Sequence, residues 1–265
     1  MVMDYTSYKH MKIEREGKIL TIMLNRPPMN PIHYELHNEL ARLWHEVQLD
    51  HESDVVIFTG AGKVFSAGGD IPMMQKRIDD PELFNRKNLE MKQMIFGLLD
   101  LEKPVIARVN GDCIGLGATL ALLCDIVIAV DDARFGDPHV KMGYVAGDGG
   151  AIIWPQLIGY ARAKEYLLTG DPLDAKEAER IGLINHAVPR DQLDAKVNTL
   201  AQKLANGPTK AIKWTKTSIN IPLRQMAHSM LDASLAYEAM TNIGADHQEA
   251  VTAFQEKRKP RFTGR

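Results

Sequence analysis

The sequence predicts an α/β fold that continues into a helical C-terminal segment. Four short runs of β-branched residues, typical of strands, are separated by segments in which apolar side chains recur at helical spacing. After Gly149 strand signals become scarce and helical patterns dominate. A chain of 265 residues can form one large α/β domain. We expect a core over residues 1–200 and a helical segment over residues 201–265.

The four predicted strands cover residues 19–25, 54–60, 104–110 and 125–130. The last three are almost continuously apolar, which is typical of strands that are covered on both faces of a sheet. The most apolar stretch, residues 114–130, is near the lower length limit for a membrane span and contains Asp125. A buried helix followed by a buried strand is therefore the better interpretation.

Helical patterns lie between and after these strands. Residues 33–50 carry an apolar stripe at three- and four-residue steps. Asp80 and Pro81 are typical of an N-cap and a first helical position, for a helix that reaches about Leu101. Residues 247–262 form a charged amphipathic helix.

Composition narrows the classes of function. There are 32 basic and 34 acidic residues, with a net charge of -2, so no global field favours nucleic acid or an anionic membrane. Cys113 and Cys124 form no CxxC motif, which argues against a zinc site and against a disulfide framework. The N-terminus lacks an apolar signal region. We expect a cytoplasmic protein without a metal.

Several common motifs are incomplete. The sequence "GAGKV" has no Ser or Thr after Lys63, as a phosphate-binding loop requires. His33 and His37 are four residues apart, but Tyr34 stands where a zinc protease has glutamate. We interpret both histidines as solvated helix-surface residues. Ser66 lacks the glycine that precedes the nucleophile of a serine hydrolase by two residues.

Two segments share the pattern of an apolar strand, a turn of small residues and a helix. They are "FTGAGKVFSAGGDI" (58–71) and "VNGDCIGLGATLAL" (109–122), and the second does not match the dinucleotide fingerprint GxGxxG. Glycines let a ligand approach the backbone, and N–H groups at a helix start lack intrahelical partners. Two such groups that converge form an oxyanion hole. The pattern alone favours the simpler interpretation, that these are only tight turns in an α/β core.

Seven motifs in order suggest a family. They are "NRP" (25–27), "FSAGGDI" (65–71), "KPVIARVNGDCIGLG" (103–117), "CDIVIA" (124–129), "ARFGDP" (133–138), "A..A..IGLIN" (175–185) and "AFQEKRKPRF" (253–262). Together they resemble the crotonase, or enoyl-CoA hydratase/isomerase, superfamily. The resemblance implies a crotonase-like spiral of ββα units over residues 1–200. It also implies a C-terminal segment that forms a homotrimer, or a hexamer built as a dimer of trimers.

The resemblance also implies a substrate and a set of binding residues. The substrate is an acyl thioester of coenzyme A, used in fatty acid or ring degradation, and no separate cofactor is required. The N–H groups of Gly69 and Leu116 would form the oxyanion hole. Coenzyme A would contact Ala67, Asp70, Ile71, Phe254 and Lys257. The basic residues 257–259 would face its pyrophosphate.

The sequence departs from the family where hydratases carry two catalytic glutamates, because Thr119 and His139 occupy those positions. Thr119 has no useful acidity and can only position water or a substrate oxygen. His139 can move protons near neutral pH, and Asp148 is the carboxylate expected to orient it. Taken alone, Asp148 is better explained as a helix N-cap. This assignment makes Asp137 incidental.

Residues 138–155, "PH...G.V.GDGG...WP", resemble the oxocamphor hydrolase branch, in which a His and an Asp act together to hydrolyse a carbon–carbon bond of a β-diketone without coenzyme A. Three functions stay open. The first is an acyl-CoA hydratase or isomerase that uses His139 and Asp148. The second is a carbon–carbon hydrolase of a β-dicarbonyl compound, and the third is a non-catalytic acyl-CoA binding protein. Met73, Met74, Met91 and Met94 are candidates to line the acyl pocket.

Overall fold

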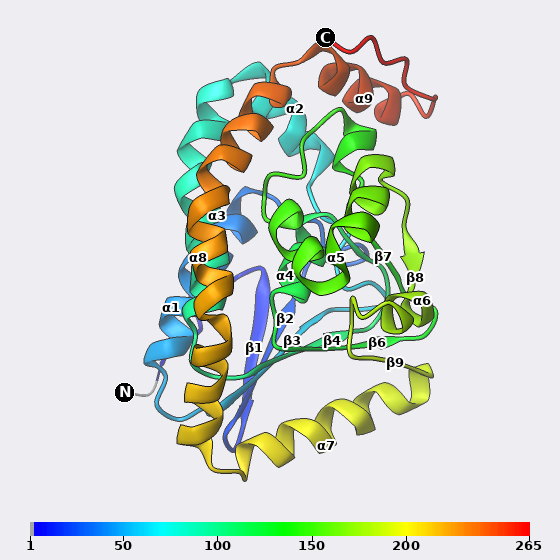
Figure 1. Cartoon of the computed structure of the whole chain (residues 1–265). Helices are drawn as coiled ribbons and strands as arrows, with labels where there is room; N and C mark the ends of the chain where they lie inside the picture. The colour runs from blue at the N-terminus through cyan, green and yellow to red at the C-terminus, as the bar shows by residue number, and fades with distance from the viewer. Residues whose placement is uncertain (1–2) are drawn as a thin grey trace.

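The computed structural model describes residues 3–265 and has two β-sheets surrounded by helices (Figure 1). The strands are β1 (Met11–Glu16), β2 (Ile19–Leu24), β3 (Val55–Gly60), β4 (Val105–Val109), β5 (Cys113–Ile114), β6 (Ile126–Val130), β7 (Arg134–Gly136), β8 (Leu173–Asp174) and β9 (His186–Val188). The larger sheet has the order β1-β2-β3-β4-β6-β9 and the smaller one the order β5-β7-β8. In the larger sheet β1 and β2 pair antiparallel, whereas the other pairs are parallel.

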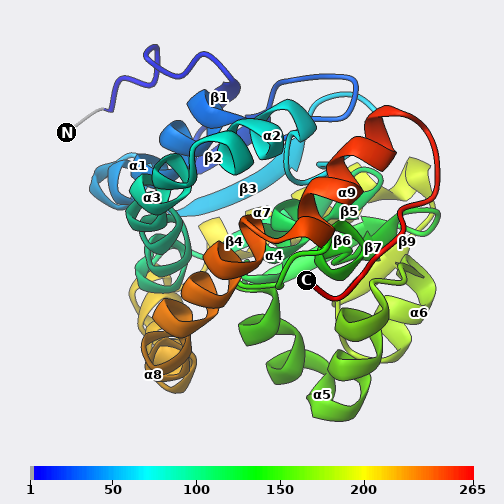
Figure 2. The same ribbon diagram turned by 90° about the horizontal axis from the view of Figure 1, so that it is seen from above.

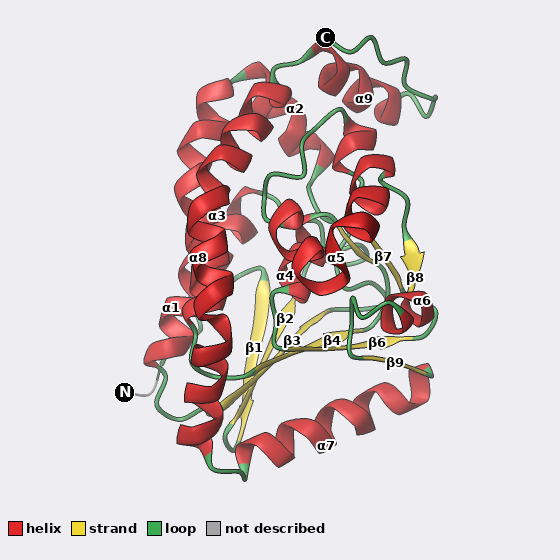
Figure 3. Cartoon of the chain, in the orientation of Figure 1, coloured by secondary structure: helices red, strands yellow, loops and turns green. Residues whose placement is uncertain are grey.

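Figure 3 shows the helices packed around both sheets. They are α1 (Tyr34–Leu49), α2 (Ile71–Asp79), α3 (Pro81–Asp100), α4 (Leu116–Leu122), α5 (Gly150–Thr169), α6 (Ala175–Arg180), α7 (Leu193–Ala205), α8 (Thr209–Asn242) and α9 (Ala245–Gln255). Two short 3₁₀ helices cover His139–Met142 and Arg190–Gln192. The mixed α/β architecture with a helical C-terminal segment confirms the predicted fold class.

The predicted strands and the first two predicted helices match their observed bounds within one residue at each end. The helix predicted over residues 247–262 is observed as α9 over Ala245–Gln255, so its predicted C-terminal end is wrong. The chain leaves the helix there because Lys257 has φ +55° and Pro260 follows. The predicted cap of α3 is wrong in one detail, since the Asp80 side chain makes no capping hydrogen bond. It forms an ion pair with Arg86 at 3.0 Å instead. Pro81 is the first residue of α3, as expected.

The buried core lies on both faces of the parallel strands. All six residues of β3 are buried, and Phe58 in its centre packs edge-to-face against Trp44 and Phe65, with ring centroids 5.4 Å apart in both pairs. Such aromatic pairs add to the free energy gained by burial. Because β3 and β4 are parallel neighbours, the segments that follow their carboxyl ends start side by side. Both of these segments are the glycine-rich turns.

Helix α8 joins the C-terminal segment to the core and runs along α3 (Figure 1). Its Lys216 side chain is buried and forms an ion pair with Asp125 at 2.7 Å. Helix α9, seen from above in Figure 2, contacts α2 and the 3₁₀ helix His139–Met142. The division after residue 200 stays a prediction, and α7 spans that position.

Several large apolar side chains of the C-terminal helices are exposed, namely Trp214, Ile219, Ile221, Tyr237, Met240 and Ile243. This surface is of the kind that a homo-oligomer covers, and the expected trimer or hexamer stays a prediction. Among residues 3–265 no helix is both long enough and apolar enough to cross a membrane.

Candidate active site

The two glycine-rich turns lie in direct contact. Ser66 and Cys113 form a parallel bridge, and the Ile114 N–H donates to the Ser66 carbonyl at 3.0 Å. Gly68 has φ +81°, and a methyl group in place of its hydrogen would lie 2.7 Å from the Ile114 carbonyl oxygen. Only glycine satisfies both conditions. The close approach is therefore encoded in the residues of the turns.

Gly69 and Leu116 each follow this contact by one or two residues and line the same pocket. Leu116 is the first residue of α4, so its N–H has no intrahelical acceptor. Within residues 3–265 no backbone carbonyl accepts a hydrogen bond from either N–H. The structure thus brings both expected donors to one pocket and leaves both available to a ligand.

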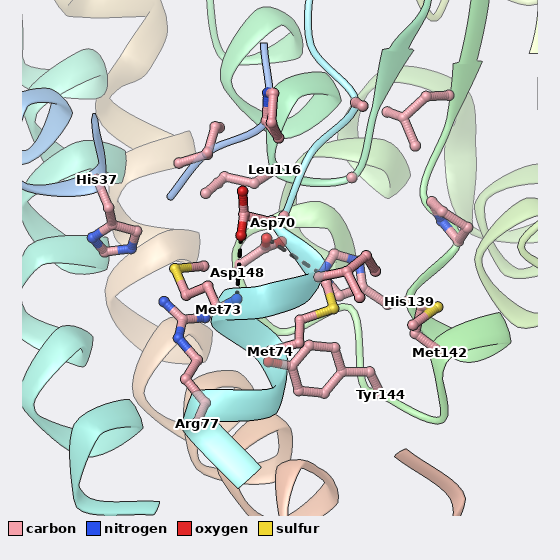
Figure 4. Close-up of a pocket in the computed structure, with 18 of the residues that line it drawn as sticks. His37, Asp70, Met73, Met74, Arg77, Leu116, His139, Met142, Tyr144 and Asp148 are labelled. Carbon is pink, nitrogen blue, oxygen red and sulfur yellow. Dashed lines mark hydrogen bonds and ion pairs between the residues drawn. The ribbon is translucent and has the colours of Figure 1, made fainter. Parts of the chain in front are cut away.

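The pocket has a volume of about 610 Å³, within the usual range for small-molecule sites. Its mouth is formed by exposed side chains that include Met29, Pro72 and Phe254. Its interior is formed by buried side chains that include Arg77 and Glu238. Figure 4 shows the labelled side chains that point into it. The pocket therefore runs from an exposed mouth at Phe254 to a buried end at Arg77 and Glu238.

Three of the four methionines expected at the pocket line it, namely Met73, Met74 and Met91. Met94 is fully buried and is not among the lining residues. The unbranched thioether side chains give the pocket an adaptable apolar wall.

His139 lies at the wall of the pocket between two carboxylates, and Figure 4 shows it beside one of them, Asp148. Its Nδ1 atom is hydrogen-bonded to Asp137 Oδ1, and its Nε2 atom lies 3.4 Å from Asp148 Oδ2. The interpretation of Asp137 as incidental is therefore wrong. Asp137 holds one ring nitrogen of His139, and Asp148 faces the other.

The local chain conformation explains this arrangement. Asp137 directly follows β7, and His139 begins the 3₁₀ helix. Gly150 is the first residue of α5, and any side chain there would overlap Asp137 Oδ2. The glycine at this position is thus required by the Asp137 carboxylate.

Asp148 is not the cap of the following helix. The N-cap residue of α5 is Gly149. The buried Asp148 carboxylate lies instead beside His139 and accepts a hydrogen bond from Thr119 Oγ1 at 3.5 Å. Thr119 does not line the pocket, so its side chain contacts Asp148 and not the space that a ligand occupies.

The charges of this group follow from its burial. Burial opposes the charged form of His139, but the Asp137 and Asp148 carboxylates outweigh it and hold the pKa well above its ordinary 6.5. Burial likewise opposes the charged form of Asp148, yet the His139 imidazolium lowers the pKa of this carboxyl. At neutral pH the group is an imidazolium between two carboxylates. The Nε2 proton is then the transferable one, and the ionised Asp148 carboxylate faces it.

The residues expected to bind coenzyme A divide into two groups. Ala67, Ile71 and Phe254 line the pocket near its mouth. Asp70 also lines it, but its carboxylate caps α2 through Met73 N at 3.2 Å and forms an ion pair with Arg26 at 2.6 Å. Lys257 lies outside the pocket lining. Its neighbour Arg258 is paired with Glu249 and Glu256, at 2.5 Å in both cases.

Two residues that the sequence interpretation missed line the buried end of the pocket, Glu238 and Arg77. Burial, reinforced by the Asp148 carboxylate, raises the pKa of Glu238 to about 8. A signal for Glu238 exists in the sequence, because it continues the buried stripe of α8 formed by Ala227, Leu231 and Leu235. A charged residue on a buried helix stripe is a candidate functional residue.

The interpretation of His37 as a solvated surface residue is wrong. Its side chain is 1% exposed, lines the pocket and is bound through Nδ1 to Glu90 at 2.7 Å. Burial, which outweighs the Glu90 carboxylate, lowers the pKa of His37. Its neighbour His33 is partly buried, with 15% of the side chain exposed.

Asp137, His139 and Asp148 are also the residues best placed to hold a metal ion, since one ligand atom from each lies within 4.8 Å of the others. Two ligands of one ion are held about 3 Å or more apart by their bonds to it. The direct hydrogen bond between Asp137 Oδ1 and His139 Nδ1 means that these two atoms cannot both be ligands of one ion. The arrangement fits a proton-transfer group better than a metal centre.

Comparisons with known proteins place this chain among enoyl-CoA hydratases and isomerases. Residues 14–265 match the family model described as enoyl-CoA hydratase/isomerase. The short-chain-enoyl-CoA hydratase of Clostridium acetobutylicum is 37% identical over 255 residues, which cover 93% of this chain and 95% of that protein. The crystal structure of an enoyl-CoA hydratase/isomerase from Mycobacterium paratuberculosis superimposes with a TM-score of 0.90 at 35% identity, covering 94% and 99% of the two chains.

A second solved structure that superimposes on this chain is that of a β-diketone hydrolase. The β-diketone hydrolase ABDH from the cyanobacterium Anabaena, bound to (S)-3-oxocyclohexyl acetic acid, superimposes with a TM-score of 0.84 at 28% identity. The match covers 90% of this chain and 96% of that one. From the family model and the relatives at this level of identity, the chain belongs to the enoyl-CoA hydratase/isomerase family.

Proposed function

We propose that this enzyme converts an acyl thioester of coenzyme A through an enolate, with His139 and Asp148 in place of the two glutamates of ordinary hydratases. The observation that carries the proposal is the position of His139 on the wall that also presents Gly69 and Leu116. A thioester oxygen bound by those two N–H groups would bring the carbon next to it towards the imidazolium. Removal of one donor of this kind typically costs ~3 to 4 kcal/mol of transition-state stabilisation.

The proton transfers balance without a cofactor. For hydration, Asp148 takes a proton from water, the hydroxide adds to the β-carbon, and the electron pair moves to the thioester oxygen as an enolate. His139 then gives its Nε2 proton to the α-carbon. For isomerisation, Asp148 takes the proton from a substrate carbon instead. Because Nε2 and Asp148 Oδ2 are 3.4 Å apart, a proton can return directly from Asp148 to His139.

The roles of the remaining residues follow from their places. Asp137 keeps the His139 ring oriented and stabilises its charge. Thr119 positions Asp148. Ala67, Ile71 and Phe254 would contact coenzyme A at the mouth of the pocket. Coenzyme A would enter the reaction as part of the substrate and not as a separate cofactor.

The test is exchange of the α-protons of butyryl-CoA in deuterated water, followed by NMR, because exchange reports enolate formation whatever the net reaction is. We expect exchange with the wild-type protein and a loss of at least about 100-fold in His139→Ala, the low end for an acid/base group. His51→Ala, which removes an exposed histidine, is the control. Absence of both binding and exchange in the wild type, across acyl chains of two to eight carbons, would refute the proposal.

A second candidate function is hydrolysis of a carbon–carbon bond in a β-dicarbonyl compound. Two observations favour it. A carboxylate holds Nδ1 of the His139 imidazole, as in the histidines that move protons in hydrolytic enzymes. The chain is also similar in structure to the β-diketone hydrolase. Asp148 would take a proton from water, and the hydroxide would add to one carbonyl carbon. The bond to the central carbon would break, and that carbon would leave as an enolate and take the Nε2 proton.

The two functions are separated by labelled water. Incubation of cyclic 1,3-diketones with the protein in ¹⁸O water yields a keto acid with label in its carboxylate if the second function is correct. No keto acid from a broad diketone panel, together with α-proton exchange in butyryl-CoA, assigns the first function. A protein that binds acyl-CoA but gives neither reaction is the non-catalytic binding protein.

A further inference from the structure

Arg77 is a buried cation without an anionic partner. It projects from α2 into the pocket (Figure 4) and is 7% exposed. Among residues 3–265 no carboxylate oxygen lies within ion-pair distance of its guanidinium, and its Nε atom has no hydrogen-bond partner. The rings of Phe84 and Tyr34 lie 5.3 and 5.9 Å from it. Such contacts supply only a fraction of what burial of the charge costs.

Two further polar atoms at the same end of the pocket lack partners. They are the Tyr144 hydroxyl and Glu238 Oε2, and both residues line the pocket and are at least nine-tenths buried. Buried polar groups are almost always hydrogen-bonded in native proteins. Arg77, Tyr144 and Glu238 line one cavity, and a polar ligand group bound between them would satisfy the three atoms.

The charge of that ligand group follows from the properties of the three residues. Arg77 is always charged and offers several N–H donors in a planar fork that matches a carboxylate. The Tyr144 hydroxyl is a donor. Glu238 is neutral below about pH 8, so its carboxyl also donates instead of competing for Arg77. One cation and two neutral donors match an anion with several acceptor oxygens.

The position of Arg77 shows which part of a ligand would reach it. The pocket mouth is at Phe254, whose side chain is 60% exposed, whereas Arg77 is at the buried end. A ligand held at the oxyanion turns with its carrier group at the mouth would direct its acyl part to Arg77. The other walls of that end are largely apolar, for example Met73 and Met91, so an acyl chain fits up to its last group.

We infer that Arg77 selects substrates whose acyl part carries a carboxylate at the end remote from the reacting carbonyl, which it binds at the buried end of the pocket together with Tyr144 and Glu238. This inference rests on the proposed function in that the carrier is coenzyme A. It adds the substrate class, a dicarboxylic acid joined to its carrier through one carboxyl group.

The experiment measures binding of matched acyl-CoA pairs by calorimetry at pH 7. Each pair has one chain length and differs only in its end group: succinyl- and butyryl-CoA, glutaryl- and valeryl-CoA, adipyl- and hexanoyl-CoA. For at least one pair we expect the carboxylate member to bind the wild-type protein about 10- to 100-fold more tightly, the usual effect of a hydrogen bond to a charged group. No preference in any pair would overturn the inference.

The variants are Arg77→Met and Arg77→Lys. Arg77→Met is expected to abolish the preference and to leave the methyl-ended member bound as before, because methionine fits the apolar wall and removes an unpaired buried charge. Arg77→Lys should keep part of the preference. Lys76→Met removes an exposed cation from the same helix and is expected to change nothing. A preference that survives in Arg77→Met would equally overturn the inference.

A CoA-free pair separates this inference from the proposed function. If no acyl-CoA binds, the acyl-CoA proposal fails, and 3-oxocyclohexanecarboxylate is compared with its primary amide on the same four proteins. Tighter binding of the acid that is lost in Arg77→Met would support anion selection by Arg77 without coenzyme A. Equal binding of acid and amide, or binding of neither, would overturn it.

Discussion

Replacing Glu238 by glutamine is expected to make the protein more stable at alkaline pH and to change little at acidic pH. The Glu238 carboxyl is 3% exposed, and burial with the Asp148 carboxylate raises its pKa from 4.5 to about 8. The folded chain therefore holds a proton that the unfolded chain has already released at neutral pH. Because the pKa is raised on folding, the stability declines as the pH rises from about 4.5 to about 8.

The magnitude follows from this difference. The pKa rises by 8 − 4.5 = 3.5, and at 1.36 kcal/mol for each pKa unit this corresponds to a ceiling of about 5 kcal/mol. Water that enters the pocket can solvate the ionised carboxylate, so we expect about 2 to 5 kcal/mol. A chain of this length changes its melting temperature by roughly 2 °C per kcal/mol. The expected effect is thus about 4 to 10 °C.

The assay is the melting temperature of wild type and Glu238→Gln at intervals from pH 5 to pH 9. The quantity compared is the difference between the two proteins, since other titrating groups affect both alike. Glu165→Gln removes the same charge from an exposed site on α5 and should show a constant difference. If the Glu238→Gln difference is also constant from pH 5 to pH 9, the carboxyl is not held neutral in the folded protein and the reasoning is wrong.

Three further predictions test the site and the core. Asp137→Asn should lower the pKa of His139, as followed by NMR of its Cε1 proton, and reduce turnover about 100-fold or more; an unchanged pKa would show that Asp137 does not hold the imidazolium. Phe58→Ala, which removes a fully buried ring, should cost about 3 to 5 kcal/mol in urea unfolding, and a loss below about 1 kcal/mol would contradict the packing described. Lys216→Met should cost about 3 to 5 kcal/mol by leaving Asp125 unpaired, and adding Asp125→Asn should recover part of it; no recovery would mean that the ion pair is not the cause.

The predicted strands were recognisable because burial on both faces removes polar residues from them. Strand β1 lacks this signal, since most of its residues are exposed and only Met11 is buried. The strands of the smaller sheet are two or three residues long, too short to show any periodicity. Their place is set by contacts with the glycine turns, which no local pattern records.

The site likewise contains residues that a local sequence pattern reveals and residues that only the folded structure reveals. Gly69, Leu116, His139 and Asp148 were predicted from motifs, and the structure brings all four to one pocket or beside it. Asp137 had a local signal that was not used, because a carboxylate only two residues from a histidine can bend back to its ring through the turn at Pro138. Arg77 had none, because its significance depends on the absence of a partner, and partners are chosen by the fold.

The charge of the His139 group explains how a family member can lack both glutamates. Two glutamates that act as one acid and one base hold a single proton between them and carry a net charge of −1. An imidazolium between Asp137 and Asp148 also carries a net charge of −1 and also has one transferable proton. The substitution therefore conserves the charge of the pocket and the number of mobile protons. A glutamate at position 139 alone would bury three carboxylates together, at positions 137, 139 and 148. Their mutual repulsion would raise their pKa values, so that part of the group would be protonated and fewer carboxylates could act as a base.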